Sequence, residues 1–463
     1  MRVTLIRNHD FCNNSRQIDL VRKRAGVLPH LGLSYMHTAL TKRGHQVQTL
    51  DAQALGLTSE GLLQAMQEFQ PGLVGVTATT PSVPGAVEAC RVAKEVDAIT
   101  ILGGPHTEVM DVENLYHDCI DYVGVGEGAT IMPDLADALD GDGDVSGIPG
   151  LVSREFHNGP AEMLSLEEIG WPERESTPIE LYHSIMADKP FTTMISSRGC
   201  PFQCSFCFKQ AVDKKSMFRT PEDVVGEMQY LVERFGVREI MFYDDIFTMK
   251  KKRVYEICEL IGKRGLKVRW EAPTRVDLVD EKLLAAMARA GCVRLRFGIE
   301  SGDQDILLKM RKESDTGVIE EAVRTAKRVG IQTFGYFIVG WIGESETQFR
   351  STVDLARDIP LDFASFYTAT PLPGTQLHHE AVASGLTPDD YWLRYIRGES
   401  DDRIGFLVED AEERSREAYR RFYYRWSKVP TLARRMTDPT MAWDVVSGLA
   451  SLMKSASNHV RDM

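Results

Sequence analysis

The stretch SRGCPFQCSFCFKQ, from Ser197 to Gln210, places Cys200, Cys204 and Cys207 within eight residues. Three thiols separated by three and then by two residues can ligate one metal ion or cluster. A closed structural zinc or iron–sulfur site normally takes four protein ligands. The stretch therefore predicts a metal centre whose own motif supplies one ligand too few.

Three interpretations fit these cysteines. A zinc knuckle would take its fourth ligand from elsewhere, and Cys258, Cys292 and several histidines are candidates, although the sequence has no second closely spaced pair. Three buried cysteines without a metal are another interpretation. The third is a [4Fe–4S] cluster held by three thiolates, whose open iron binds a substrate or cofactor.

The chain after Phe191 alternates strand-like and helix-like segments. The expected strands are FTTMISS, EIMFYDD, KVRWEAP, VRLRFGIE, TFGYFIVG and DFASFYTAT. Six such units predict a partial or complete β/α barrel over residues 191–380, with its chemistry at the carboxyl ends of the strands. Residues 381–463 are largely helical in pattern, and we expect a small C-terminal helical domain there.

The chain before the cysteines predicts a second α/β domain over residues 1–145. Its expected strands are RVTLIRN, HQVQTLDA, LVGVTATT, ITILGGPH and DYVGVGEG, and helical patterns such as LGLSYMHTALTKRG lie between them. Continuous apolar strands that alternate with helices indicate a doubly wound, Rossmann-like parallel sheet. The turn-rich segment DGDGDVSGIPG opens a connecting segment, which we assign to residues 146–190.

A nucleotide cofactor such as NAD or a flavin is the obvious ligand of a doubly wound domain. The first strand is not followed by G-x-G-x-x-G, which phosphate binding at the first helix requires. The segment GVGEGA, residues 124–129, follows the fifth expected strand instead. The pattern therefore argues against a dinucleotide.

The arrangement CxxxCxxC, with Phe206 just before the last cysteine, resembles the signature of the radical S-adenosylmethionine (SAM) superfamily. That family carries its motif directly after the first barrel strand, as here. The resemblance implies that the amino and carboxylate groups of SAM occupy the open iron. An electron from the cluster then cleaves SAM to methionine and a 5′-deoxyadenosyl radical. The missing ligand would be the cosubstrate.

The later strand ends resemble the SAM-binding positions of the same family. Carboxylates would accept hydrogen bonds from SAM, a guanidinium would meet its carboxylate, and exposed backbone beside a glycine would take the adenine edge. The resemblance implies SAM contacts at Phe206, Asp244, Asp245, Arg275, Glu300, Ile338 and Gly340. The family's usual Gly-Gly-Glu is replaced here by the two aspartates, for which exposed turn residues are the alternative. A structural ion pair is the alternative for Arg275.

The strand ends of the first domain resemble those of cobalamin-binding domains fused to radical SAM barrels. A corrin needs a wide ledge lined by glycines, with hydroxyl groups for its amides. The resemblance implies cobalamin contacts at Thr79, Thr80, Ser82, Gly103, Gly104, Pro105, His106, Gly126, Glu127 and Gly128. The alternative is a degenerate domain that only packs on the barrel.

The cobalt-binding motif D-x-H-x-x-G is absent from the sequence. His106 lies in GGPHTEV, and we interpret it as a loop histidine rather than a cobalt ligand. The lower face of the cobalt would then have a weak ligand or none. We expect this to favour delivery of a methyl group to a carbon radical.

The chain as a whole resembles a cobalamin-dependent radical SAM enzyme of the type called class B. This implies methylation of a carbon, or less often a phosphorus, that lacks nucleophilicity, with a [4Fe–4S] cluster, SAM and cobalamin as cofactors. One alternative is ring formation or rearrangement without methyl transfer, as in the anaerobic ring cyclase of bacteriochlorophyll synthesis. A second alternative is a non-catalytic cobalamin or iron–sulfur carrier or sensor.

Composition limits the partners and the compartment. The 43% hydrophobic and 26% charged content is typical of a soluble protein, and the net charge of −13 argues against nucleic acid as the main partner. No apolar run approaches the roughly 18 residues of a membrane span, and the start lacks the apolar core of a signal peptide. We expect a cytoplasmic protein with no transmembrane segment, a small-molecule or carrier-bound substrate, and a flavodoxin- or ferredoxin-type electron donor.

Overall fold

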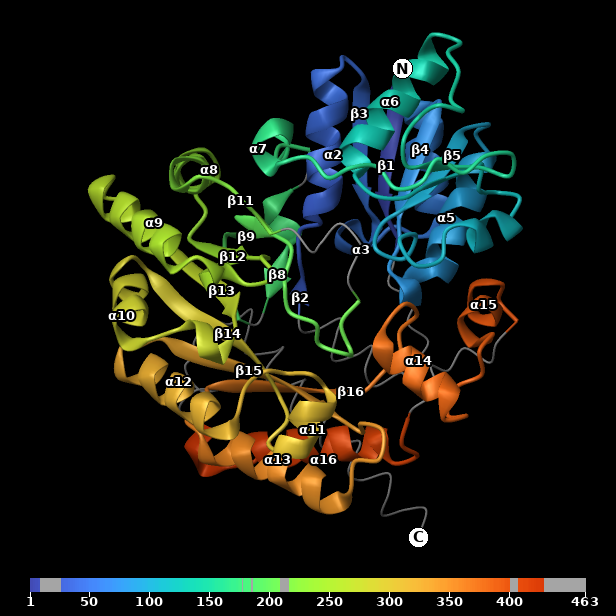
Figure 1. Cartoon of the computed structure of the whole chain (residues 1–463). Helices are drawn as coiled ribbons and strands as arrows, with labels where there is room; N and C mark the ends of the chain where they lie inside the picture. The colour runs from blue at the N-terminus through green and yellow to red at the C-terminus, as the bar shows by residue number, and fades with distance from the viewer. Residues whose placement is uncertain (9–25, 177, 185, 209–215, 400–406, 429–463) are drawn as a thin grey trace.

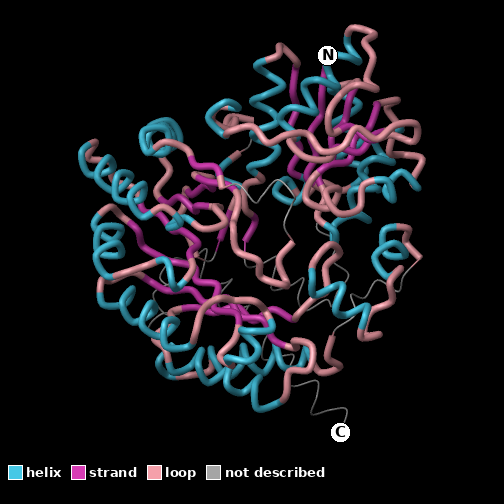
Figure 2. Tube along the Cα trace, in the orientation of Figure 1, coloured by secondary structure: helices cyan, strands magenta, loops and turns pink. Residues whose placement is uncertain are grey.

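The computed structural model describes residues 1–8, 26–176, 178–184, 186–208, 216–399 and 407–428. Two six-stranded sheets, each with its own helices, form the two halves of the molecule (Figure 1). The strands of the two sheets form two separate groups in the trace (Figure 2). The α/β class predicted from the sequence is confirmed.

The first sheet has the strand order β3-β1-β4-β5-β6-β7. Five strands are parallel: β1 (Arg2–Arg7), β3 (Gln46–Asp51), β4 (Leu73–Thr77), β5 (Ile99–Gly103) and β6 (Tyr122–Gly124). The short β7 (Leu151–Val152) is antiparallel to β6. The covering helices are α2 (Leu31–Lys42), α3 (Ala52–Leu55), α4 (Ser59–Phe69), α5 (Val83–Lys94) and α6 (Gly128–Asp140). Two separate apolar clusters, one with α4 and α5 and one with α2 and α6, show that both faces are covered.

The second sheet is an open, curled half-barrel. Its strands are all parallel and pair in chain order: β9 (Phe191–Met194), β12 (Glu239–Phe242), β13 (Arg269–Thr274), β14 (Cys292–Glu300), β15 (Gln332–Val339) and β16 (Phe363–Thr368). The helices are α8 (Pro221–Phe235), α9 (Lys251–Lys263), α10 (Glu281–Arg289), α11 (Gln304–Lys309), α12 (Thr316–Arg328) and α13 (Glu346–Asp358). Because β9 and β16 do not pair, the barrel is partial. The sequence predicted either a partial or a complete barrel.

Side chains alternate strictly along β15. Thr333, Phe337 and Val339 are buried, whereas Phe334 and Tyr336 are half-buried. Successive side chains of a strand point to opposite faces of the sheet. The buried set packs in the core with the outer helices, so the half-buried set lies on the concave face.

The C-terminal helices divide between the two halves. They are α14 (Gln376–Ala383), α15 (Tyr391–Ile396) and α16 (Ala411–Tyr423). Tyr395 donates a hydrogen bond to the carbonyl of Pro81 in the first half, at 2.8 Å. The Tyr423 hydroxyl donates to the carbonyl of Ala364 on β16, also at 2.8 Å. The limits of the four predicted domains stay predictions.

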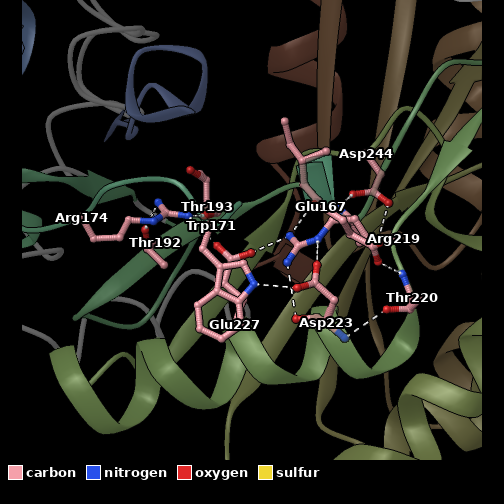
Figure 3. Close-up of polar contacts among 12 residues, drawn as sticks. Glu167, Trp171, Arg174, Thr192, Thr193, Arg219, Thr220, Asp223, Glu227 and Asp244 are labelled. Carbon is pink, nitrogen blue, oxygen red and sulfur yellow. Dashed lines mark hydrogen bonds and ion pairs between the residues drawn. The ribbon is translucent and has the colours of Figure 1, made fainter. Parts of the chain in front are cut away.

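The described part of the connecting segment has only short elements: β7, α7 (Leu166–Ile169), a 3-10 turn (Ile179–Leu181) and β8 (His183–Ser184), which pairs with β2 (Gly26–Val27). Buried charges fix it to the barrel (Figure 3). Arg174 of the segment and Arg219 both bind Glu227 of α8, at 3.1 and 2.5 Å. Within the described residues, no helix is long and apolar enough to cross a membrane.

Candidate functional site

The cysteines lie on a loop whose base is closed by β10 (Ser197–Arg198), which pairs with β11 (Met217–Phe218). Cys200 and Cys204 are half-buried, and Cys207 is exposed. In the part of the chain that the structure describes, no three Cys, His, Asp or Glu side chains converge as a metal-binding group. The donor set fits a cluster by its chemistry, since one short loop carries three cysteine sulfurs.

The cysteines considered as a distant fourth ligand lie elsewhere. Cys258 on α9 and Cys292 on β14 are both buried in the apolar core between the sheet and its outer helices. Burial raises the pKa of both thiols, which keeps them protonated at neutral pH. The core cluster that holds both thiols contains none of the loop cysteines, so this position argues against the zinc knuckle.

Two aspartates at the end of β12 hold the start of the loop. Asp244 accepts hydrogen bonds from the backbone N–H of Ser196 at 2.7 Å and from the hydroxyls of Ser196 and Ser197 at 2.5 Å. Asp245 accepts from the N–H of Gly199 at 2.8 Å. Burial raises the pKa of Asp244, while the serine donors act in the opposite direction. Both predicted SAM-binding aspartates are therefore engaged with the loop, and their contact with SAM stays a prediction.

The middle of the loop is bound to two helices. The backbone N–H of Ser205 donates to the carbonyl of Met310 at 3.0 Å, and its hydroxyl donates to the carbonyl of Lys309 at 3.0 Å. The carbonyl of Ser205 accepts from Leu377 at 2.9 Å. The loop is thus fixed on both sides of Cys204, which a metal site requires of its ligands.

Arg275 is fixed by two groups. It forms a two-pronged ion pair with Asp277, with N–O distances of 2.9 and 3.0 Å. Its guanidinium carbon lies 3.7 Å from the ring centre of Phe202, inside the cysteine loop. Arg275 therefore supports the loop, and the structural ion pair considered as an alternative is present. Its predicted contact with the SAM carboxylate is untested.

Glu300 ends β14 with a left-handed backbone, at φ 70°. It is buried and pairs with Lys312 at 2.9 Å. Burial raises the pKa of Cys204, whereas the charges of Lys312 and Arg275 favour its thiolate. Two buried cations thus lie near the thiol, where they would stabilise an anionic cluster.

The remaining predicted SAM contacts are Phe206 on the cysteine loop, Ile338 on β15 and Gly340 in the turn after it. Phe206 and Ile338 pack with Trp341 in one apolar cluster, and the rings of Phe206 and Trp341 are 6.3 Å apart. The N–H of Gly340 donates to Glu344 at 2.7 Å. The backbone N–H of Gly340 is therefore already used, and only its carbonyl is left for an adenine.

In the first half, His106 is a buried residue with both ring nitrogens engaged. Nδ1 lies 3.1 Å from the Thr80 hydroxyl and Nε2 lies 3.2 Å from the Asn114 side-chain oxygen. Burial lowers the pKa of His106 to about 4, against a smaller opposing effect of Asn114. In this conformation neither nitrogen is open to a metal.

The buried neutral imidazole predicts a pH dependence of stability. In the unfolded chain the imidazole has its ordinary pKa near 6.5, whereas in the folded protein its pKa is about 4. Between these two pH values only the unfolded chain binds the proton. The free energy of unfolding should therefore fall as the pH drops from about 6.5 to 4. Urea titrations at pH 7 and pH 5 should show a loss about 2 kcal/mol smaller in His106→Gln than in the unmodified protein. Equal losses in the two proteins would contradict this.

The predicted glycine ledge is largely a packing requirement. A Cβ on Gly104, whose φ is 100°, would lie 2.6 Å from the Thr77 hydroxyl and 2.7 Å from the Ala78 carbonyl. A Cβ on Gly126 would meet the backbone of Ala161. On Gly128 it would lie 2.9 Å from the sulfur of Met36. These glycines allow the chain's own segments to approach one another.

Gly103 differs from the other three glycines. The nearest atom to its Cβ position is the Gly124 carbonyl at 4.0 Å. The polar residues on the neighbouring loop are partly engaged: Ser82 binds the backbone and hydroxyl of Thr79 at 2.9 and 3.1 Å, and Pro105 is exposed. Of the predicted cobalamin contacts, Thr79 and Pro105 are exposed, and Gly103 is the glycine with the most room for a side chain.

One ion pair joins the two halves at the site. Glu127, at the start of α6, pairs with Arg198 at 3.0 Å, and Arg198 also donates to the carbonyl of Leu164. Arg198 comes two residues before Cys200. The loop after β6 and the cysteine loop are thus in direct contact. The sequence offered no sign of this pair, nor of the partners Lys312 and Glu344.

Two family models match the chain. The radical SAM superfamily model matches residues 194–356, and the B12 binding domain model matches residues 18–136. Together they cover the cysteine loop and the strand ends of the first sheet.

Relatives in sequence span most of the chain. An uncharacterised methyltransferase of Pyrococcus horikoshii is 33% identical over 407 residues, which are 86% of this chain and 88% of the relative. The anaerobic magnesium-protoporphyrin IX monomethyl ester cyclase of Rubrivivax gelatinosus is 32% identical over 77% of this chain and 67% of its own length. Among solved structures, the methyltransferase TsrM from Kitasatospora setae, with cobalamin and a [4Fe–4S] cluster bound, superposes with a TM-score of 0.69. It is 21% identical and covers 83% of this chain and 78% of TsrM.

Proposed function

We propose that this chain, which belongs to the cobalamin-binding branch of the radical SAM superfamily, methylates a carbon or phosphorus centre that lacks nucleophilicity. The family resemblance seen in the sequence is confirmed by both family models and by the relative from Pyrococcus horikoshii. The observation that carries the proposal is the direct contact between the cysteine loop and the loop after β6, through Arg198 and Glu127. Methyl transfer needs the radical and the methyl donor at one substrate.

The residues fit the family's cofactors. Cys200, Cys204 and Cys207 would hold the [4Fe–4S] cluster, the carboxyl ends of β12 to β16 would hold SAM, and the loops after β4, β5 and β6 would hold cobalamin. When bound, cluster and SAM supply one-electron cleavage of SAM, and cobalamin supplies the methyl group. The protein's own part is to fix the loop, to supply cations beside Cys204 and to exclude water.

A second candidate is ring formation without methyl transfer, because relatives named as ring cyclases are 31–32% identical to this chain. Cluster, SAM and cobalamin positions are common to both candidates and do not separate them. A carrier or sensor is not favoured, since a carrier has no need of the strand ends that the family uses for SAM.

Anaerobic reconstitution with iron, sulfide, cobalamin and SAM tests the proposal. After addition of a reductant, mass spectrometry should detect both S-adenosylhomocysteine and 5′-deoxyadenosine. Both products together indicate methyl transfer, whereas deoxyadenosine alone favours the cyclase candidate. Absence of both would contradict the radical SAM assignment of activity. We further propose a low-potential flavodoxin or ferredoxin as the physiological reductant and the cytoplasm as the compartment.

Gly103 provides the test of cobalamin binding. Gly103→Val should fold, because open space surrounds the new side chain, and β-branched residues suit strand ends. It should weaken hydroxocobalamin binding at least tenfold if the corrin lies on β5, measured by absorbance titration. Gly104→Val should instead fail to fold, because its Cβ would overlap Thr77 and Ala78. Unchanged hydroxocobalamin affinity in the folded Gly103→Val protein would show that the corrin does not lie on β5.

A further inference from the structure

Three tyrosines lie uncovered on the concave face of the second sheet. Tyr243 follows β12, and Tyr336 and Tyr367 lie on β15 and β16. Tyr243 is 42% exposed and Tyr367 49% exposed, whereas Phe337 and Phe366 on the outer face are 0% and 2% exposed. We name Tyr243, Tyr336 and Tyr367 the tyrosine platform.

The platform is continuous across the sheet. The ring centres of Tyr336 and Tyr367 are 6.2 Å apart, and Phe334 extends the row with its centre 4.8 Å from that of Tyr336. Arg296 on β14 spans the remaining gap, with its guanidinium carbon 5.2 Å from the ring centre of Tyr243. The planes of Tyr336 and Tyr367 are tilted by 36°, so a flat ligand would stack on one ring and contact its neighbour obliquely.

The platform presents hydrogen-bond donors. Burial raises the pKa of Tyr243 and of Tyr336, and the nearby positive charge of Arg296 acts in the opposite direction. A phenol carries its own O–H, so each hydroxyl can donate a hydrogen bond to a ligand. Burial raises the pKa of Tyr336 to about 12, so the hydroxyl stays protonated at neutral pH.

Arg296 shares its carboxylate partner with a second arginine. Of the described carboxylates, only that of Glu271 lies within 4.0 Å of it, at 3.5 Å, and the other oxygen of Glu271 is bound by Arg294. The Nε of Arg296 is buried, and a terminal nitrogen of its guanidinium donates to the carbonyl of Phe242. A ligand oxygen on the platform would therefore meet the phenol hydroxyls beside a cation.

The platform lies beside the proposed cofactor sites. Tyr243 directly precedes Asp244, which holds the cysteine loop. A ligand on the platform would thus lie beside the start of the cysteine loop.

We propose that the tyrosine platform binds the substrate, and that this substrate is a planar conjugated ring system bearing carbonyl or carboxylate oxygens. The flat faces stack on the rings, and the oxygens accept from the phenols and Arg296. The inference rests on the proposed function for the reaction that follows binding, but the binding itself is measured separately.

The test uses the full, reconstituted chain and two probes of equal charge. Naphthalene-2,6-dicarboxylate is planar, and decahydronaphthalene-2,6-dicarboxylate is not. Equilibrium dialysis should show that only the planar probe binds appreciably. Tyr336→Phe should weaken its binding about fivefold, the effect of one lost hydrogen bond, and Tyr367→Ala roughly tenfold through lost stacking.

The matched control is Tyr116→Ala. Tyr116 is 56% exposed and also has an arginine, Arg397, over its ring at 4.8 Å, but it lies in the first half. The Tyr116→Ala variant should bind the planar probe with the same affinity as the unmodified protein. Equal binding of both probes, or unchanged binding in Tyr336→Phe and Tyr367→Ala with full iron content, overturns the inference.

The same samples separate this inference from the proposed function. Selective binding of the planar probe by protein that does not cleave SAM supports the platform and refutes the proposed reaction. Cleavage of SAM by protein that does not distinguish the probes refutes the platform alone. Tyr243→Phe repeats the donor test if Tyr336→Phe fails to fold.

Discussion

Cys204→Ala should abolish the brown colour of the anaerobically reconstituted protein and reduce 5′-deoxyadenosine formation to the level of a sample without protein. Two remaining thiolates hold a four-iron cluster poorly, and Cys204 is the thiol that lies near the buried cations Lys312 and Arg275. Iron and sulfide analysis, with chromatography of the SAM products, measures both effects.

The control for this prediction is Cys258→Ala. Cys258 is buried in the apolar core on α9 and lies outside the loop. Its replacement should leave iron content and SAM cleavage within about twofold of the unmodified protein, since a small buried side chain loses little on shortening to alanine. Stoichiometric zinc in protein prepared under iron-replete, oxygen-free conditions would refute the iron–sulfur cluster. Loss of metal in Cys258→Ala would support the zinc site with Cys258 as its fourth ligand.

Glu227→Gln should lower the free energy of unfolding by about 3–5 kcal/mol, the cost of leaving a buried charge without its partner. Glu227 is 1% exposed and lies between Arg174 and Arg219. Arg219 keeps a second carboxylate, Asp223 at 2.6 Å. Arg174 keeps only Thr192 and the Thr193 carbonyl among the described groups. Urea unfolding followed by circular dichroism measures the loss.

Two further variants show that the loss comes from charge. Glu233→Gln changes an exposed carboxylate on the same helix and should cost less than about 0.5 kcal/mol. The double variant Arg174→Met/Glu227→Gln should be more stable than Glu227→Gln alone, because the unpaired guanidinium is removed. If both single variants lose the same amount, the buried ion pairs contribute nothing specific.

The strands could be predicted because buried parallel strands are continuous apolar runs. All residues of β4, Leu73–Thr77, are buried, and their run of apolar residues was sufficient to place them. The expected strand continued to Thr80, but the structure ends it at Thr77. The hydroxyl of Ser82 accepts the N–H of Thr79 and starts the next turn, and this local competition is not visible in hydrophobicity.

The site residues could be identified by type but not by partner. Asp244 was expected to bind SAM, and it binds Ser196 and Ser197, which lie 48 and 47 positions earlier in the chain. A sequence shows that a carboxylate ends a strand, but not which donors other segments bring to it. The same holds for Glu300 and Lys312. Gly104 was expected to line a ledge, whereas its left-handed backbone and its contact with Ala78 require a glycine without any ligand.

The ion pair between Glu127 and Arg198 should couple the evolution of these two positions. The side chain of Glu127 is 9% exposed and that of Arg198 is 21% exposed. Loss of either one would leave the other charge unpaired and poorly hydrated at the contact between the halves. Substitutions at the two positions should therefore accumulate together as lineages diverge. A chimera that takes residues 1–145 from one ancestor and the remainder from another would need both members from the same parent.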